Sequence, residues 1–256
     1  MSEKKYIKMT RDKGAAFLLM DRPKHNVLDI EMIREFTAAL KEAAADPDLK
    51  CLVIRGKGAG FCAGVEVSDH KPEMVHEMIS SFNTIFEAME TLEIPVIAAV
   101  EGACLGGGME VAIACDIIVA AKGAVFGQPE IKLGFLPPFA AIRLPELVGP
   151  ARAIEICASG RRYSAKEGRR MGFVSHVFSD DKFEKKLGKL IKEFTYSSPL
   201  ILRLNKRAVK AHLGLPFKDA LAGVSDLFLN TLMKTEDTLE GIKSFEEKRP
   251  AEWKNR

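Results

Sequence analysis

The chain has 256 residues, of which 47% are hydrophobic, so it can bury a full core as one large domain or as a domain with an appendage. Lysine and arginine total 38 against 35 acidic residues, a net charge of +3, and no basic block is interleaved with aromatic residues, which argues against a nucleic-acid partner. The five cysteines are odd in number and form no C-x-x-C pair, which favours free thiols over a disulfide framework or a zinc site.

Neither the N-terminal segment nor the longest apolar stretch predicts membrane contact. Residues 1–14, MSEKKYIKMTRDKG, contain no apolar run of signal-peptide length and no transit-peptide pattern. The stretch 94–121 is interrupted by Glu101, Glu110 and Asp116 and by three consecutive glycines, which argues against a transmembrane span. We therefore expect a cytoplasmic protein with no membrane partner.

The first half of the chain alternates strand signals with helix signals. Short runs of β-type residues flank Asp12-Lys13-Gly14 and predict a hairpin. The later expectations are, in chain order, a helix from the Asp29 cap to about Ala45, a strand at 51–56, a helix from about Pro72 to Leu92, a strand at 95–102, a short helix after the triple glycine and a strand at 116–121. Strands that alternate with helices indicate right-handed βαβ crossovers and an α/β fold.

The last third of the chain is mostly helical. Residues 173–178, FVSHVF, are the last strand candidate. After residue 180 we expect only helices, with breaks near 197–199 and 214–216 and an end near Lys248. Such a helical stretch after an α/β core is more typical of an oligomerisation or lid element than of an independent domain.

Two glycine-rich loops raise the question of nucleotide binding. GKGAGF (56–61) lacks the last glycine of the dinucleotide fingerprint, and GACLGGGME (102–110) lacks the Gly-Lys-Ser/Thr of a P-loop. A glycine-rich turn into a helix can instead bring bare N–H groups close to a ligand oxygen. The N–H groups of Gly107 and Gly108 would lie unpaired at a helix start, as in an oxyanion hole, although tight helix–strand packing also favours glycine.

Two carboxylates stand in apolar surroundings. Glu110 lies one turn inside a short apolar helix, where it is either a functional acid or a partner of the helix dipole. Glu130 lies in GQPEIKLGFLPPF (127–139), where an unpaired charge would be costly to bury. The two can converge if the strand at 116–121 returns the chain to the glycine turn, and a shared apolar pocket would then hold one acid and one base.

The sequence offers no competing nucleophile or metal-ligand set. Ser159 lies in CASGR, which is not a G-x-S-x-G elbow, and no H-E-x-x-H motif is present. We expect the five histidines to be surface or satisfied core residues: His25, His70, His76, His176 and His212.

These stretches together indicate a family. The resemblance to the enoyl-CoA hydratase/isomerase, or crotonase, superfamily is carried by FCAGVEV, AAVEGACLGGGMEVAIACDIIVAA, FGQPEIKLG and RLPELVG. It runs in order from DRPKHNVLD near the start to GIKSFEEKRPAEWK near the end. The resemblance implies a crotonase-like spiral of ββα units over residues 1–197 and a helical trimerisation region over 198–256, assembled as a homotrimer or homohexamer.

The same resemblance implies the ligand and the chemistry. The ligand would be an acyl-CoA thioester, with coenzyme A as part of the substrate and no separate cofactor or metal. The activity would be hydration of a 2-enoyl-CoA; the alternatives are a double-bond isomerase of the same fold and a non-catalytic acyl-CoA-binding oligomer. By motif position the oxyanion hole would be Ala63 and Gly107, and the catalytic acids Glu110 and Glu130. The substrate-binding residues would be Gly64, Val65, Glu66, Lys24, Pro138, Phe139, Phe245 and, from a neighbouring subunit, Lys248.

Two stretches depart from the common family pattern. GFLPPFAAIRLP replaces a glycine-rich run after the second glutamate, and Glu66 stands where aspartate is usual. Pro138 removes a backbone donor because proline has no N–H, and Phe139 is expected near the acyl pocket. Both stretches resemble the cyclohexa-1,5-diene-1-carboxyl-CoA hydratases, which implies a cyclic acyl group.

Overall fold

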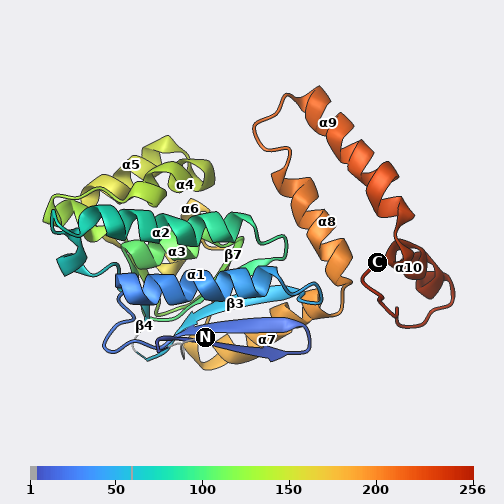
Figure 1. Cartoon of the computed structure of the whole chain (residues 1–256), viewed down its shortest axis with the longest axis horizontal. Coiled ribbons are helices and arrows are strands. Elements are labelled where there is room, and N and C mark those ends of the chain that lie inside the picture. The colour runs from blue at the N-terminus through green and yellow to red at the C-terminus, as the bar shows by residue number, and fades with distance from the viewer. Residues whose placement is uncertain (1–4, 59) are drawn as a thin grey trace.

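A six-stranded sheet lies at the centre of the molecule (Figure 1). The computed structural model describes residues 5–58 and 60–256, so residue 59 of the first glycine-rich loop lies outside the described part. The strands lie in the order β1 (Ile7–Asp12), β2 (Ala15–Met20), β3 (Cys51–Gly56), β5 (Val96–Val100), β7 (Ile117–Ala121) and β10 (His176–Phe178). The β1–β2 pair is the predicted antiparallel hairpin, and the other neighbours pair in parallel.

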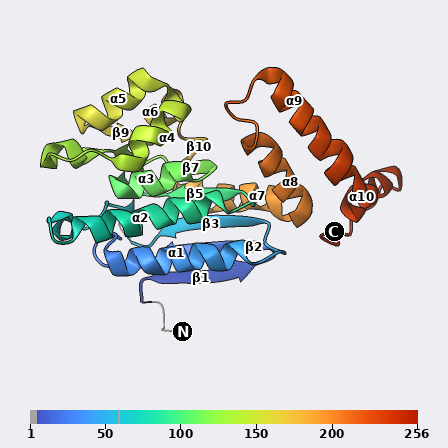
Figure 2. The same cartoon turned by 45° about the horizontal axis from the view of Figure 1, so that its top comes forward.

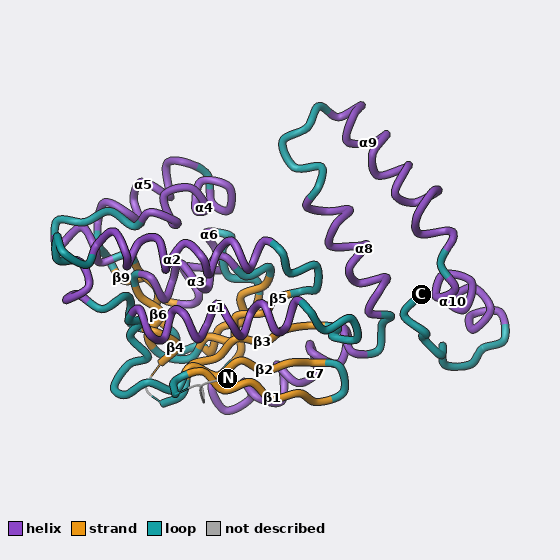
Figure 3. The backbone as a smooth tube through the Cα atoms, viewed as in Figure 1, coloured by secondary structure: helices purple, strands orange, loops and turns teal. Residues whose placement is uncertain are grey.

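A smaller sheet of three-residue strands completes the spiral. Its order is β4 (Gly60–Cys62), β6 (Ala103–Leu105), β8 (Val125–Gly127) and β9 (Arg162–Ser164), with β4, β6 and β8 parallel and β9 antiparallel to β8. Figure 3 shows β4, β6 and β9 gathered near one end of the large sheet. Each of the pairs β3–β4, β5–β6 and β7–β8 places its first strand in the large sheet and its second in the small one. This confirms the predicted spiral of ββα units.

Both faces of the large sheet are buried. In β3, Leu52 and Ile54 join the core beneath the helices α1 (Ile30–Ala44) and α2 (Val75–Glu90), whereas Cys51 and Val53 pack against α7 (Phe183–Thr195). Because successive side chains point to opposite faces, a strand covered on both sides needs apolar residues at every position. This explains the continuous apolar runs in the sequence.

The helices largely follow the predictions. The Asp29 side chain accepts a hydrogen bond from the Met32 N–H at 2.8 Å, which confirms the predicted cap of α1. The short helix after the triple glycine is α3 (Gly107–Ala114). Five other helical segments of the core were not predicted: η1 (Val67–His70), η2 (Pro129–Leu133), α4 (Pro138–Val148), α5 (Pro150–Ser159) and α6 (Ala165–Met171). The segment η3 (Asp180–Lys182) begins the stretch for which only helices were expected.

The C-terminal region is an arm that stands away from the core (Figure 2). It consists of α8 (Pro199–Lys210), α9 (Phe217–Asp226), η4 (Leu227–Thr231), η5 (Leu232–Lys234) and α10 (Glu236–Glu246). The breaks before α8 and α9 were predicted, and the break at Thr235 before α10 was not. Lys206 anchors the base of the arm, since its Nζ lies 2.6 Å from Asp116 Oδ2 and donates to the Ile94 carbonyl at 2.8 Å. None of the helices in the described residues has both the length and the apolar composition needed to cross a bilayer.

The buried carboxylate of Asp237 ties the end of the chain to this arm. It accepts hydrogen bonds from the Ser198 hydroxyl at the start of α8 and from the backbone N–H groups of Lys254 and Asn255, the latter two at 2.7 and 3.0 Å. The Asn255 side chain in turn donates to the Pro47 carbonyl at 2.9 Å, beyond the end of α1. The C-terminal residues therefore connect α10, α8 and the core.

Candidate active site

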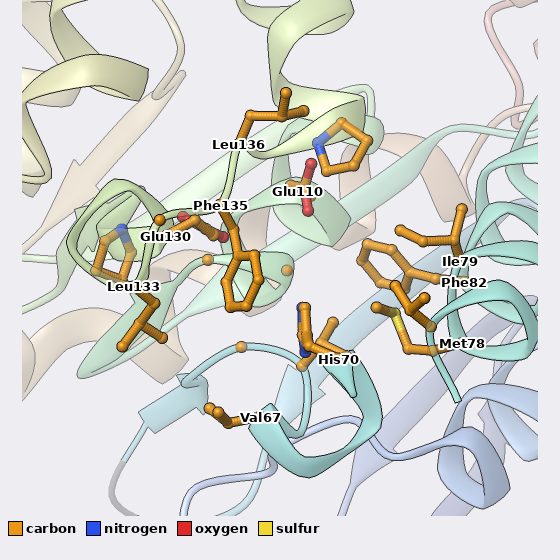
Figure 4. A pocket seen from close by; sticks show the side chains of 18 of the residues that line it. Val67, His70, Met78, Ile79, Phe82, Glu110, Glu130, Leu133, Phe135 and Leu136 are labelled. Atoms are coloured by element: carbon orange, nitrogen blue, oxygen red, sulfur yellow. The ribbon is translucent and has the colours of Figure 1, made fainter. Parts of the chain in front are cut away.

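A cavity lies at the carboxyl ends of three parallel strands. Because β4, β6 and β8 are parallel, their carboxyl ends meet at one edge of the small sheet. The segments 63–65, 106–107 and 129–130, which follow these strands, line one cavity of about 430 Å³ (Figure 4). The carboxyl ends of parallel strands are the usual place for a ligand in α/β folds.

The other walls of this cavity are largely apolar. They come from η1 and α2 on one side and from the end of η2 to the start of α4 on the other. Their side chains are Val67, His70, Val75, Met78, Ile79, Phe82, Leu133, Phe135, Leu136 and Pro138. An apolar pocket with a few polar groups is the typical form of a small-molecule site.

Glu110 is almost fully enclosed in this cavity. It lies in the first turn of α3, and 2% of its surface is exposed. The Ala140 N–H, in the first turn of α4, donates to Glu110 Oε1 at 2.8 Å. The pKa of Glu110 is raised to about 7, mainly by burial and to a smaller extent by the charge of Glu130, while hydrogen bonds from the N–H groups of Ala140 and Phe139 oppose the rise. Glu110 can therefore gain or lose a proton near neutral pH.

Glu130 enters the cavity from η2, directly after β8. Burial raises its pKa, and its own backbone N–H opposes the rise. The Gln128 amide lies 3.1 Å from both carboxylate oxygens and 3.3 Å from the Gly106 carbonyl oxygen, and since all three are acceptors, its NH2 group faces them. Gly106 has φ of 53°, and a Cβ there would lie 2.7 Å from Glu130 Oε1, so glycine is required beside the carboxylate.

Two backbone N–H groups lie close together beside the start of α3. The first backbone hydrogen bond of α3 runs from the Glu110 N–H to the Gly106 carbonyl at 3.0 Å. The Gly107 N–H lies before this bond and is therefore not used within the helix. In the facing segment, the Gly64 carbonyl and the Glu66 N–H both pair with Leu28 at 2.9 Å, which turns the Val65 N–H to the opposite side.

The Val65 N–H has no hydrogen-bond partner among the described residues. Its nitrogen lies 3.4 Å from the point that a Cβ atom on Gly107 would occupy, so the two residues are close neighbours. The Ala63 N–H, in contrast, donates to the His25 carbonyl at 3.0 Å. This hydrogen bond corrects the predicted pairing of Ala63 with Gly107, because the Ala63 donor is already used. Ala63 still lines the cavity, and Val65 supplies the donor beside Gly107.

The segment after Glu130 also corrects one prediction. The Phe139 ring stacks on Phe86 of α2, with centroids 3.8 Å apart and planes at 4°, and packs against the core rather than the cavity. The aromatic side chain that lines the cavity is Phe135. Pro138 also lines it and begins α4, where its missing N–H leaves Phe139 and Ala140 as the donors toward Glu110.

The other predicted binding residues of the core lie around the segment 63–66. Gly64, like Val65, lines the cavity. The Glu66 carboxylate forms an ion pair with Arg22 at 3.6 Å, so its charge is directed toward the loop before α1. Lys24 is exposed and adjoins His25, whose carbonyl holds Ala63.

Phe245 and Lys248 lie far from this cavity in the same chain. Phe245 is near the end of α10 with 85% of its surface exposed, and Lys248 follows the helix with a positive φ of 55°. Figures 1 and 2 place α10 at the far end of the arm, away from α2 and α4. These residues can contact a ligand only in the cavity of another subunit.

Sequence reasoning missed Gln128, which contacts Glu130 from outside the cavity lining, and His70, which lines the cavity. Gln128 is fully buried directly after the apolar strand β8. A polar residue in that position could have indicated a hydrogen-bonding role in the site. His70 was expected at the surface or in the core, but it lines the cavity and packs against Phe135, with ring centroids 4.8 Å apart. That contact joins segments remote in sequence, so no local pattern indicated it.

Comparisons with known proteins show what this chain is similar to. Residues 10–256 match the profile of the family described as enoyl-CoA hydratase/isomerase. Cyclohexa-1,5-dienecarbonyl-CoA hydratase of Thauera aromatica is 36% identical over 248 residues, which cover 97% of this chain and 96% of that protein. A "probable enoyl-CoA hydratase" of Rhizobium meliloti (strain 1021) is 37% identical over 93% of this chain and 94% of that protein. The crystal structure of an enoyl-CoA hydratase from Bacillus anthracis aligns with a TM-score of 0.93 at 29% identity, covering 98% of this chain and all of that one.

Proposed function

Because the chain belongs to the enoyl-CoA hydratase/isomerase family, we propose that it adds water across the C2=C3 bond of a 2-enoyl-CoA thioester. The observation that carries this proposal is the presence of two carboxylates with raised pKa values, Glu110 and Glu130, in one cavity. Hydration needs one group to take a proton from water and another to deliver one to carbon, and a carboxylate pair can do both.

In the proposed reaction the N–H groups of Val65 and Gly107 hold the thioester oxygen. Negative charge that develops on this oxygen is stabilised by two donors and by the N-terminal end of α3, which makes C3 electrophilic. Glu110 takes a proton from water as the hydroxyl adds to C3. Glu130 starts protonated and delivers its proton to C2, which leaves Glu130 ionised and Glu110 protonated. A proton then passes from Glu110 to Glu130, so the substrate gains one water in net and both carboxyl groups return to their starting states.

We further propose that the acyl group is cyclic, as in cyclohexa-1,5-diene-1-carboxyl-CoA. Support comes from the Thauera aromatica relative, which carries that substrate in its name. The cavity adds support, because the apolar rings of Phe82 and Phe135 line it and can pack against a compact six-membered ring.

The coenzyme A portion would leave the cavity past the 63–65 segment. Lys24 would then meet its phosphates, and Phe245 and Lys248 would come from a neighbouring subunit. We propose a homotrimer or homohexamer for this reason and because the arm exposes many large apolar side chains, including Phe217, Leu229 and Phe245. Light scattering coupled to gel filtration tests this, since a monomeric protein would contradict it.

The decisive experiment compares two substrates and one variant. Crotonyl-CoA and cyclohexa-1,5-diene-1-carboxyl-CoA are assayed by loss of the conjugated thioester absorbance, and the products are analysed by mass. We expect Glu130→Gln to lower kcat about 100-fold or more while it still binds the CoA ester. Exposed Glu73, replaced by glutamine, serves as the control and should leave turnover unchanged.

Each outcome of this experiment decides a separate point. Turnover of Glu130→Gln at the normal rate would overturn the two-carboxylate mechanism. Double-bond migration without a gain of one water would instead identify an isomerase, and no reaction with either thioester would favour a binding protein. A clear preference for crotonyl-CoA would remove the cyclic substrate from the proposal.

A further inference from the structure

His70 and Phe135 meet across the cavity. Their ring centroids are 4.8 Å apart with the planes tilted by 30°. In Figure 4 the two rings approach each other from opposite walls, His70 from η1 and Phe135 from the segment after η2. They stand between Val67 and Leu133 on one side and Met78, Ile79 and Phe82 on the other, so they form a partition within the cavity.

The His70 side of this partition is fixed to the segment that carries Val65. His70 Nδ1 lies 3.0 Å from the Glu66 carbonyl oxygen, and because a carbonyl accepts, Nδ1 is the protonated nitrogen. The Glu66 N–H in turn donates to the Leu28 carbonyl at 2.9 Å. Asp69, next to His70, accepts from the Ile30 N–H at 3.3 Å, which ties η1 to the start of α1. The imidazole therefore has a defined place relative to the proposed oxyanion donors.

The Phe135 side is fixed to the segment that carries Glu130. The Phe135 N–H donates to the backbone carbonyl of Glu130 at 3.0 Å. Gly134, with φ of 81°, makes the left-handed turn that ends η2 and allows this return. The backbone of Phe135 is thus held beside the backbone of Glu130, so a shift of the segment that carries the ring would disturb the turn that positions Glu130.

The two sides of the partition differ in burial. Met78 and Phe82 are 1% and 3% exposed, and the enclosed Glu110 belongs to the same buried part of the cavity. Val67 and Leu133, on the other side, are 56% and 58% exposed and belong to its rim. An acyl group bound in the buried part therefore reaches the partition before it reaches the rim.

We propose that the His70–Phe135 pair limits the length of the acyl group, so that short or cyclic acyl-CoA thioesters are accepted and long straight-chain ones are excluded. This inference rests on the proposed function, because it assumes that the cavity holds an acyl chain. A long chain can pass only by separating the two rings, which breaks their contact and strains both anchoring turns. A compact ring fits against the flat faces without displacing them.

The test measures binding of thioesters that cannot react. Saturated butyryl-CoA and octanoyl-CoA are titrated by calorimetry against the full-length protein, its His70→Ala/Phe135→Ala double variant, and the two single variants. Exposed His76 on α2, replaced by alanine, is the matched control. Each additional methylene that becomes buried contributes about fourfold in affinity, so burying two of them gives roughly a fifteenfold gain.

We expect the preference for octanoyl-CoA over butyryl-CoA to rise about tenfold or more in the double variant and to stay unchanged in His76→Ala. The single variants should show smaller rises, and they decide the question if the double variant does not fold. An unchanged ratio in folded variants, or strong octanoyl-CoA binding by the unaltered protein, would overturn the inference. Saturated thioesters cannot be hydrated, so a failure of the hydratase proposal would be seen separately in the turnover assay.

Discussion

Replacement of Glu110 by glutamine is expected to remove hydration and, at the same time, to stabilise the fold at alkaline pH. In the folded protein Glu110 is buried beside a second carboxylate, and its pKa is raised from an ordinary 4.5 to about 7. An unfolded chain loses this proton near pH 4.5, whereas the folded chain keeps it until about pH 7. The carboxylate therefore costs folding free energy as the pH rises from about 4.5 to about 7, and the cost stays constant at higher pH.

The magnitude follows from the pKa difference. A shift of about 2.5 units at about 1.4 kcal/mol per unit makes the ionised carboxylate cost about 3 kcal/mol of stability at about pH 8.5. Glutamine carries no charge and can still accept from the Ala140 N–H, but its NH2 group would lack an acceptor, at a cost of about 1 kcal/mol. We expect Glu110→Gln to be about 2 kcal/mol more stable than the unaltered protein at about pH 8.5 and about equal to it at about pH 5.

Urea unfolding at these two pH values measures the difference. All proteins are compared at one protomer concentration, because subunit association would otherwise contribute to the apparent stability. Exposed Glu73→Gln is the control and should show no pH-dependent gain. If Glu110→Gln gains no stability between about pH 5 and about pH 8.5, the reasoning from burial to pKa is refuted.

Two further predictions concern residues that hold the site and the arm in place. Gln128→Met removes N–H donors that favour the ionised form of Glu130, so the pKa of Glu130 should rise. The limb of the pH profile of kcat/KM that reports Glu130 should therefore move to higher pH. A profile that falls in height without moving along the pH axis would contradict this role of Gln128. Asp237→Ala leaves buried N–H groups of the C-terminal tail without an acceptor and should cost about 1–3 kcal/mol, visible as a lower Tm and faster proteolysis near the C-terminus.

Elements with a strong local signal were predictable from the sequence. The continuous apolar run of β3 and the Asp29 cap of α1 each fix their element by local chemistry. The four strands of the small sheet were not predicted, because three residues are too few to show a period. They are specified by pairing with strands distant in the sequence. In the β4–β6 ladder, for example, Cys62 lies opposite Cys104.

The candidate site was partly predictable for the same reason. Residue type alone singled out Glu110 and Glu130, since carboxylates in apolar runs are uncommon. The direction of a backbone N–H depends instead on pairing, and the bridge to Leu28 decides that Val65 rather than Ala63 presents its donor. In the same way, the packing of α4 on α2 turns Phe139 into the core.

The parallel arrangement of β4, β6 and β8 has a consequence for how this protein can diverge from its relatives. Each strand delivers one segment of the cavity, and the segments 63–65, 106–107 and 129–130 contribute different groups to it. The hydrogen bonds of the small sheet do not depend on the side chains beyond the strand ends. One segment can therefore be exchanged while the other two keep their geometry, so new substrates and reactions are accessible through changes at a single strand end.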